Sequence, residues 1–129
     1  MHRFEIQEED DIVAARNAAR TILSRLGCSV IDKTRIATAV SELARNTLVH
    51  GGGGHVEMEI VHGDAETGIR CIFIDNGPGI VDVKNAMVNG FSANGSPGNG
   101  LQASQQLVDV FKIDSEVGKG TRVEIIKWV

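Results

Sequence analysis

The sequence is poor in the residues that build disulfide frameworks and aromatic cores. Its 129 residues include two cysteines and no tyrosine, and aromatic residues make up 4% of the chain. Cys28 and Cys71 are too few for a disulfide framework or a cysteine-based metal site. The core must therefore consist mainly of Ile, Val, Leu and Ala. A chain of this length is expected to form one domain over residues 1–129.

Long hydrophobic runs and an excess of positive charge are also missing. No apolar run approaches the roughly 20 residues that span a bilayer, and residues 1–5 lack the apolar core of a signal peptide. The formal net charge of -4 argues against nucleic-acid binding through overall charge. We therefore expect a cytoplasmic protein whose partners include neither a membrane nor a nucleic acid.

The first half of the chain shows helical periodicity. A short strand is predicted over residues 2–7. The four carboxylates of residues 8–11 then favour the start of a helix, which Gly27 ends. A second helix is predicted from Ser29 onward, and it stops at the glycine run 51–54, which we interpret as a flexible connector.

The second half of the chain is dominated by strands. Residues 56–60 and 69–74 predict an antiparallel hairpin. A further helix over 101–110 is followed by two more strands, 111–117 and 121–129. The segment between Gly77 and Gly100 is rich in Gly, Asn and Ser, and long loops of this kind usually form lids or binding loops. Helices on one face of a mostly antiparallel sheet make an α+β fold, a two-layer α/β sandwich.

The first candidate site is the turn Asp75-Asn76-Gly77-Pro78-Gly79-Ile80, which follows an apolar strand. Gly77 and Gly79 lack the Cβ atoms that would keep a ligand away from the backbone. The carboxylate of Asp75 can accept a hydrogen bond from an exocyclic amino group, as on adenine, whereas guanine presents an oxygen there. Taken alone the pattern is weak, because an ordinary turn after a strand has a similar sequence.

The second candidate site lies on the second helix. Glu42 and Asn46 are four residues apart, so they share one stripe of the helix beside the apolar stripe. Magnesium takes few protein oxygens, and that of Asn46 is a suitable one. Glu42 can accept the proton of an attacking hydroxyl. A solvated polar pair is the competing interpretation when these two residues are considered alone.

The third candidate site is Ser96-Pro97-Gly98-Asn99-Gly100-Leu101. Glycines at the start of a helix expose backbone N–H groups and the positive end of the helix dipole, which suits phosphates. The stretch is neither a P-loop nor a dinucleotide-binding fingerprint, because it lacks Gly-Lys-Ser/Thr and a preceding strand. The three sites together would supply an adenine acceptor, a phosphate cradle, and a magnesium ligand with a general base.

These motifs, in this order, resemble the nucleotide-binding fold shared by histidine kinases, Hsp90, gyrase-type topoisomerases and MutL. The matching motifs are Glu42-x-x-x-Asn46 (the N box), Asp75-x-Gly77-x-Gly79, Gly98-x-Gly100-Leu101 and Gly118-x-Gly120-Thr121. Within that superfamily, the stretch 34–46 and the Lys127-Trp128 ending resemble the RsbT-type switch kinases, small serine kinases of bacterial partner-switching systems. The resemblance covers nearly the whole chain.

The resemblance implies a Bergerat-type sandwich with three main helices on one face and an ATP lid. It implies ATP and Mg2+ as cofactors, with Glu42 as the catalytic base and Asn46 as the metal ligand. The remaining implied site residues are Asp75, Gly77 and Gly79 at the adenine, Gly98, Gly100 and Leu101 at the phosphates, and Thr121 near the adenine end. The implied substrate is a serine on a STAS-domain antagonist protein, and the implied second partner is a PP2C-type phosphatase that the kinase activates.

The sequence departs from the family at two places, and two alternatives stay open. Ser96-Pro97 stands where the branch usually has a further glycine, and Gln102-Ala103 follows Leu101 where the family often has Pro-Gly. One alternative is an anti-sigma kinase that sequesters a sigma factor. The other is a non-catalytic module that binds a nucleotide and acts by occupying its partners.

Overall fold

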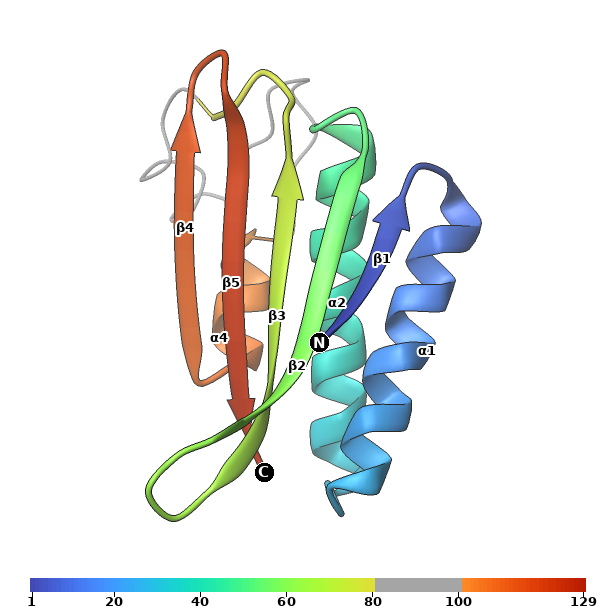
Figure 1. Ribbon diagram of the computed structural model, residues 1–129, viewed down its shortest axis with the longest axis vertical. Helices are drawn as coiled ribbons and strands as arrows, with labels where there is room; N and C mark the ends of the chain where they lie inside the picture. The colour runs from blue at the N-terminus through green and yellow to red at the C-terminus, as the bar shows by residue number, and fades with distance from the viewer. Residues whose placement is uncertain (81–100) are drawn as a thin grey trace.

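Five strands form one antiparallel sheet, and the helices cover one of its faces (Figure 1). The computed structural model describes residues 1–80 and 101–129. The strand order is β1-β2-β3-β5-β4, with antiparallel pairing throughout. The elements are β1 (His2–Ile6), α1 (Glu9–Arg25), α2 (Val30–Val49), β2 (Gly54–His62), β3 (Thr67–Asp75), α4 (Leu101–Leu107), β4 (Val110–Glu116) and β5 (Gly120–Trp128). The predicted α+β two-layer sandwich is confirmed.

The two long helices begin where the sequence predicted, because side chains satisfy their first backbone N–H groups. The Asp11 carboxylate accepts hydrogen bonds from the backbone nitrogens of Gln7 (2.8 Å) and Glu8 (3.1 Å). At the start of α2, the Ser29 Oγ accepts one from the backbone nitrogen of Asp32 at 3.1 Å.

No helix in residues 1–80 and 101–129 is long and apolar enough to cross a membrane.

The hydrophobic core lies between the helices and the sheet. Alternate residues of β3, such as Cys71 and Phe73, are buried on the helix side, where α2 contributes Ile36, Val40 and Leu43. Among the described residues, Phe73 is the only aromatic side chain that is fully buried. The core is thus largely aliphatic, as the composition predicted.

The face of the sheet opposite the helices carries a row of ion pairs. The Arg70 guanidinium lies 2.8 Å from both the Glu59 and the Glu124 carboxylates, and Arg122 contacts Glu124 at 3.2 Å. The hydrogen bond from Arg70 holds the pKa of Glu124 below its usual value. The charged groups of this row neutralise one another.

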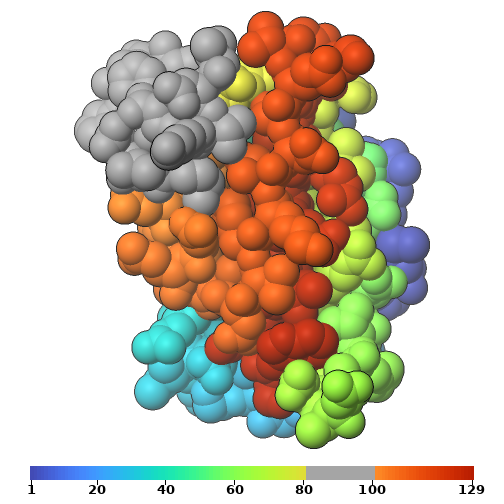
Figure 2. Space-filling view, turned by 90° about the vertical axis from the view of Figure 1, so that its left-hand side faces the viewer, coloured from blue at the N-terminus to red at the C-terminus, as the bar shows by residue number. Residues whose placement is uncertain are grey.

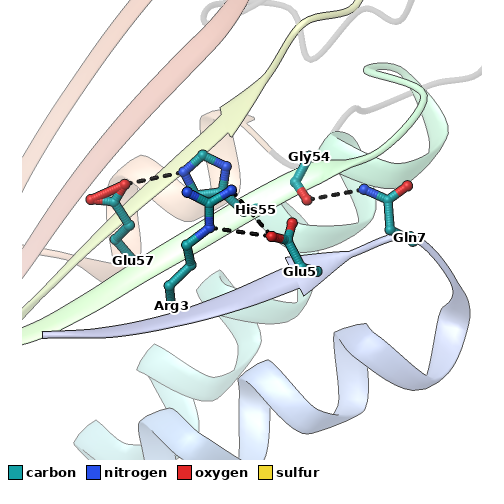
Figure 3. Close-up of polar contacts among 6 residues, drawn as sticks. All are labelled: Arg3, Glu5, Gln7, Gly54, His55 and Glu57. Carbon is teal, nitrogen blue, oxygen red and sulfur yellow. Dashed lines mark hydrogen bonds and ion pairs between the residues drawn. The ribbon is translucent and has the colours of Figure 1, made fainter.

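The edge formed by β1 and β2 is also polar (Figure 3). Arg3 pairs with Glu5 at 3.1 Å, and His55 lies 3.1 Å from Glu57. The Gln7 side-chain amide donates to the Gly54 carbonyl oxygen at 3.3 Å and so ties the end of β1 to the start of β2. These polar groups contact one another on a partly exposed surface, where an ion pair such as Arg3–Glu5 contributes little to stability.

The boundary between α4 and β4 differs from the prediction. The sequence predicted a helix over 101–110, but the helix ends at Leu107 and the strand begins at Val110. The backbone nitrogen of Asp109 donates a hydrogen bond to the Ile126 carbonyl oxygen at 3.0 Å. The Asp109 carboxylate accepts one from the backbone nitrogen of Trp128 at 2.7 Å. Pairing with β5 therefore draws the chain out of the helix. Figure 2 shows this flank, where the residues of α4 and β4 (orange) form a continuous surface.

Ser104→Ala is expected to stabilise the protein by about 1 kcal/mol. Ser104 on α4 is 0% exposed, and within the described residues its Oγ has no hydrogen-bond partner. Removing an unsatisfied hydroxyl ends its desolvation cost, and alanine also favours the helix. Urea unfolding measures the change. Ser41→Ala, which removes a hydroxyl that donates to the Ala37 carbonyl at 2.9 Å, is the control and should not stabilise. A loss of stability in Ser104→Ala would contradict this account.

Candidate functional site

The carboxylate of Asp75 is held at the end of the central strand β3. In the strand register, Asp75 lies between Gly54 of β2 and Thr121 of β5. Its Oδ1 accepts a hydrogen bond from the backbone nitrogen of Gly77 at 2.9 Å. Three paired strands therefore fix the position of this carboxylate, which is half-buried at the edge of the core.

Burial raises the pKa of Asp75 above its ordinary value, although the backbone N–H groups of Gly77 and Thr121 act in the opposite direction. Within residues 1–80 and 101–129, no cationic side chain forms an ion pair with this carboxylate. A partly desolvated carboxylate without a counter-charge can accept hydrogen bonds from a ligand. Such perturbed groups are candidates for functional sites.

Asp75→Asn is expected to raise the stability of the ligand-free protein at neutral pH. A carboxyl group whose pKa is raised on folding binds its proton more tightly in the folded state. It therefore stabilises the fold at low pH, and this contribution is lost as pH rises through the raised pKa. The neutral carboxamide of the variant avoids that loss and can still accept the hydrogen bond from the Gly77 nitrogen. Between pH 4 and pH 8, the melting temperature of wild type should fall below that of Asp75→Asn as pH rises. A difference in melting temperature that does not change with pH would contradict this explanation.

The glycine run after α2 packs against Asp75. A Cβ on Gly51 would overlap the Asp75 side chain, and one on Gly77 would lie 2.6 Å from the Gly51 carbonyl oxygen. Gly54 belongs to β2, and a Cβ there would overlap the Ile74 carbonyl oxygen and lie 2.9 Å from the Thr47 Cγ2. Gly51 and Gly54 therefore form a tightly packed joint with β3, whereas a Cβ on Gly52 would meet nothing within 4 Å. The prediction of a flexible connector is thus wrong for Gly51 and for Gly54, which belongs to β2.

The hairpin between β4 and β5 holds the turn that follows Asp75. The backbone nitrogen of Gly118 donates to the Pro78 carbonyl at 2.9 Å, and that of Ile80 donates to the Ser115 Oγ at 2.8 Å. Gly79 has φ 77°, and a Cβ there would overlap the Glu116 carbonyl oxygen. The turn is thus fixed on the side of β4 as well as on the side of α2.

A depression of about 280 Å³ lies at this end of the sheet. Its lining residues in the described part of the chain are Ile74, Asp75, Asn76, Asp114, Ser115, Glu116, Lys119, Gly120, Thr121 and Arg122. The volume is close to the lower end of the range for small-molecule sites, roughly 300–1,000 Å³. Strand alternation places the side chains of Ile74, Asp114 and Arg122 on the face opposite the helices, so this depression does not mark the ligand site of Asp75. Asp75 and Thr121, which the sequence analysis assigned to one ligand, are neighbours on the helix side of the sheet.

Glu42 and Asn46 lie on one stripe of α2, and both are half-buried. Within the described residues, the buried Asn46 Nδ2 has no hydrogen-bond partner and the Glu42 carboxylate forms no ion pair. The backbone nitrogen of Gly51 donates to the Asn46 carbonyl at 3.0 Å, which connects this stripe to the joint beside Asp75. The unpartnered Asn46 Nδ2 is a hydrogen-bond donor and does not bind a cation. The side-chain oxygen of Asn46 is the type of ligand that Mg2+ takes, and the free carboxylate of Glu42 is a suitable proton acceptor.

The structure brings most of the predicted site residues to one end of the molecule. Asp75, Gly77, Gly79 and Thr121 are neighbours at the end of β3, and Asn46 adjoins them through the last turn of α2. Leu101 is buried at the start of α4, which packs against α2. Gly98 and Gly100 lie outside the described residues, as do Ser96-Pro97 and most of the predicted lid.

Three residues that shape the site were not assigned to it from the sequence. Gly51 and Gly54 allow the close approach of α2 to β3, and Ser115 bonds to the turn after Asp75. The run of four glycines was the available signal for the first two. Ser115 could have been found only from the pairing of β4 with β5.

Comparison with known proteins agrees with this architecture. The family model described as "Histidine kinase-like ATPase domain" matches residues 6–127. The chain is 42% identical to "Serine/threonine-protein kinase RsbT" of Bacillus subtilis (strain 168), covering 96% of this chain and 93% of that protein. It is 28% identical to "Anti-sigma F factor" of Clostridium beijerinckii, covering 95% of this chain and 89% of the relative.

Two solved structures share the fold. The mycobacterial sensor histidine kinase MprB superposes with a TM-score of 0.59 at 15% identity, covering 98% of this chain and 96% of that one. The histidine kinase domain of the blue-light activated kinase from Erythrobacter litoralis EL346 gives 0.56 at 21% identity, covering 92% of this chain and 59% of that one. The chain therefore belongs to the family of histidine kinase-like ATPase domains, in the RsbT-type branch of serine/threonine-protein kinases that its motifs predicted.

Proposed function

We propose that this protein is an ATP-dependent protein serine kinase of a bacterial partner-switching system, acting as a single domain over residues 1–129. The observation that carries the proposal is the Asp75 carboxylate, half-buried and without a counter-ion among the described residues, at the joint between α2 and the β4–β5 hairpin. An acceptor without a cation favours a neutral ligand group that donates hydrogen bonds, such as the amino group of adenine.

In this proposal the base of ATP lies at the end of β3. The free acceptor capacity of Asp75 binds the adenine amino group, and Thr121 lies next to it in the strand register. Gly77 and Gly79 let the base approach the backbone. Gly98, Gly100 and Leu101 are proposed to enclose the phosphates at the start of α4.

The proton-transfer chemistry is assigned to α2. Asn46 is proposed to hold Mg2+ through its side-chain oxygen, and the ion when bound would neutralise charge on the phosphates. Glu42 accepts the proton of the substrate serine as that hydroxyl oxygen forms its bond to the γ-phosphorus of ATP, while the bond from this phosphorus to the bridging oxygen breaks and ADP leaves. Most of the rate would come from positioning and electrostatics, as in phosphoryl transfer generally.

The proposed substrate is a serine on a STAS-domain antagonist, and the proposed second partner is a PP2C-type phosphatase that the kinase activates by binding. The support for both is the 42% identity to a relative named as a serine/threonine-protein kinase. The test is incubation of the protein with radiolabelled ATP, magnesium and such an antagonist. We expect label on the wild-type antagonist and none on an antagonist whose acceptor serine is replaced by alanine. Bound nucleotide without any labelled antagonist would reject the kinase assignment.

A second candidate function is sequestration of a sigma factor. It is favoured by the similarity to proteins named "Anti-sigma F factor", at 28% to 30% identity. Co-purification with a sigma factor in place of a phosphatase would support this alternative. Nucleotide binding without transfer to any partner would instead indicate a binding module.

A further inference from the structure

The hydroxyl of Ser115 connects the two sides of the candidate base site. Ser115 lies on β4 opposite Thr121 of β5, which in turn lies opposite Asp75 of β3. The Ser115 Oγ lies 2.8 Å from the Thr121 Oγ1. It accepts a hydrogen bond from the backbone nitrogen of Ile80 at 2.8 Å and donates one to the Gly120 carbonyl oxygen at 3.2 Å. One hydroxyl thus contacts the turn that follows Asp75 and the residue beside Asp75.

These contacts determine where the protons lie. A serine hydroxyl has one proton and two lone pairs. The Ile80 nitrogen can only donate, so it occupies one lone pair, and the Gly120 carbonyl can only accept, so it takes the proton. The second lone pair then accepts the Thr121 proton across the 2.8 Å contact. All groups of this small network are satisfied in that arrangement.

The arrangement leaves Thr121 as a hydrogen-bond acceptor on the side of the sheet that carries Asp75. Its proton is directed to Ser115, and the strand register places its hydroxyl oxygen on the same side of the sheet as the Asp75 carboxylate, which is also an acceptor. Two adjacent acceptors favour a base edge that carries an amino group. They disfavour an edge with a carbonyl oxygen, because that oxygen would lose its hydrogen bond to water and face lone pairs.

We propose that Ser115 is a positioning residue that sets the base selectivity of the site through Thr121 and the Asp75–Ile80 turn. This inference rests on the proposed function, namely that a purine nucleotide binds against Asp75. Ser115 does not need to touch the nucleotide. It fixes the Thr121 hydroxyl and the turn in one hydrogen-bonding pattern, which favours adenine over hypoxanthine and guanine.

The test is the ratio of dissociation constants for ITP and ATP, measured calorimetrically with magnesium. ITP carries a carbonyl oxygen in place of the amino group of ATP and, with it, a proton on N1. Ser115→Ala is expected to lower the ITP/ATP ratio about tenfold, the factor that corresponds to one hydrogen bond. Ser115→Thr, which keeps the hydroxyl, should stay within about threefold of wild type. In a Thr121→Val background, Ser115→Ala should change the ratio less than about twofold, because the residue through which it acts is absent.

The outcomes separate the inference from the proposed function. Wild type that binds no ATP overturns both. If wild type prefers ATP but Ser115→Ala has the same ITP/ATP ratio, the role of Ser115 alone is overturned. The same conclusion follows if Ser115→Thr loses selectivity as fully as Ser115→Ala. Ser24→Ala, on the exposed end of α1, is the control and should leave the ratio unchanged. If Ser115→Ala shows no cooperative thermal melt, Ser115→Cys gives the same test, because a thiol is a weak hydrogen-bonding group.

Discussion

Glu42→Gln is expected to lower the rate of phosphoryl transfer to the antagonist by about 100- to 10,000-fold. Glutamine keeps the size of the side chain but cannot accept a proton. Within the described residues the Glu42 carboxylate forms no ion pair, so the variant is expected to fold. The initial rate of label transfer from ATP measures the effect, and calorimetry with Mg-ATP should give an affinity within about threefold of wild type.

The control for this variant is Glu66→Gln, in the exposed loop between β2 and β3. This loop lies at the opposite end of the sheet from the end of β3 (Figure 1). The control should transfer phosphate at the wild-type rate. If Glu42→Gln also keeps more than about a third of the wild-type rate, Glu42 is not the general base.

Gly120→Ala is expected to destabilise the protein by about 3 kcal/mol and to abolish nucleotide binding at micromolar protein. Gly120 has φ 109°, where residues with a Cβ are strained. Its Cβ would overlap the Asp75 carbonyl oxygen and lie 2.9 Å from the Asn76 Cα. These are backbone atoms, so the strand that carries Asp75 would have to move. Urea unfolding and Mg-ATP calorimetry measure the two effects.

Gly118→Ala in the same hairpin is a matched control. Gly118 has φ 83°, but a Cβ there would meet nothing within 4 Å. The change therefore adds backbone strain alone, and we expect a loss of about 1 kcal/mol with nucleotide binding retained. Equal losses in the two variants would show that strain, and not the contact with Asp75, makes Gly120 necessary.

The order of the elements could be predicted because it depends on local patterns. Apolar alternation identified β2, a nearly continuous apolar run identified β3, and helical spacing together with Ser29 identified α2. The end of α4 could not be predicted in this way. Asp109 leaves the helix because it bonds to Ile126 and Trp128, and those partners are remote in the sequence.

The candidate site was predictable where a motif carries it. Asp75 and Asn46 belong to motifs with fixed spacing, so the sequence and the family resemblance identified them. The role of Gly51 follows from packing between the end of α2 and the end of β3, which no local pattern reports. Ser115 acts through its strand neighbour and the turn at Ile80, so its position becomes informative only when β4 is placed beside β5.

The most direct test of the central claim is calorimetric titration of the protein with Mg-ATP, in parallel with Asp75→Asn. We predict one nucleotide per chain for wild type and an affinity at least about 30-fold lower for Asp75→Asn, since a hydrogen bond to a charged acceptor contributes about 2 kcal/mol. The thermal melt of Asp75→Asn should confirm that the variant is folded. Absence of binding by folded wild type, or equal affinity in the two proteins, would contradict the account.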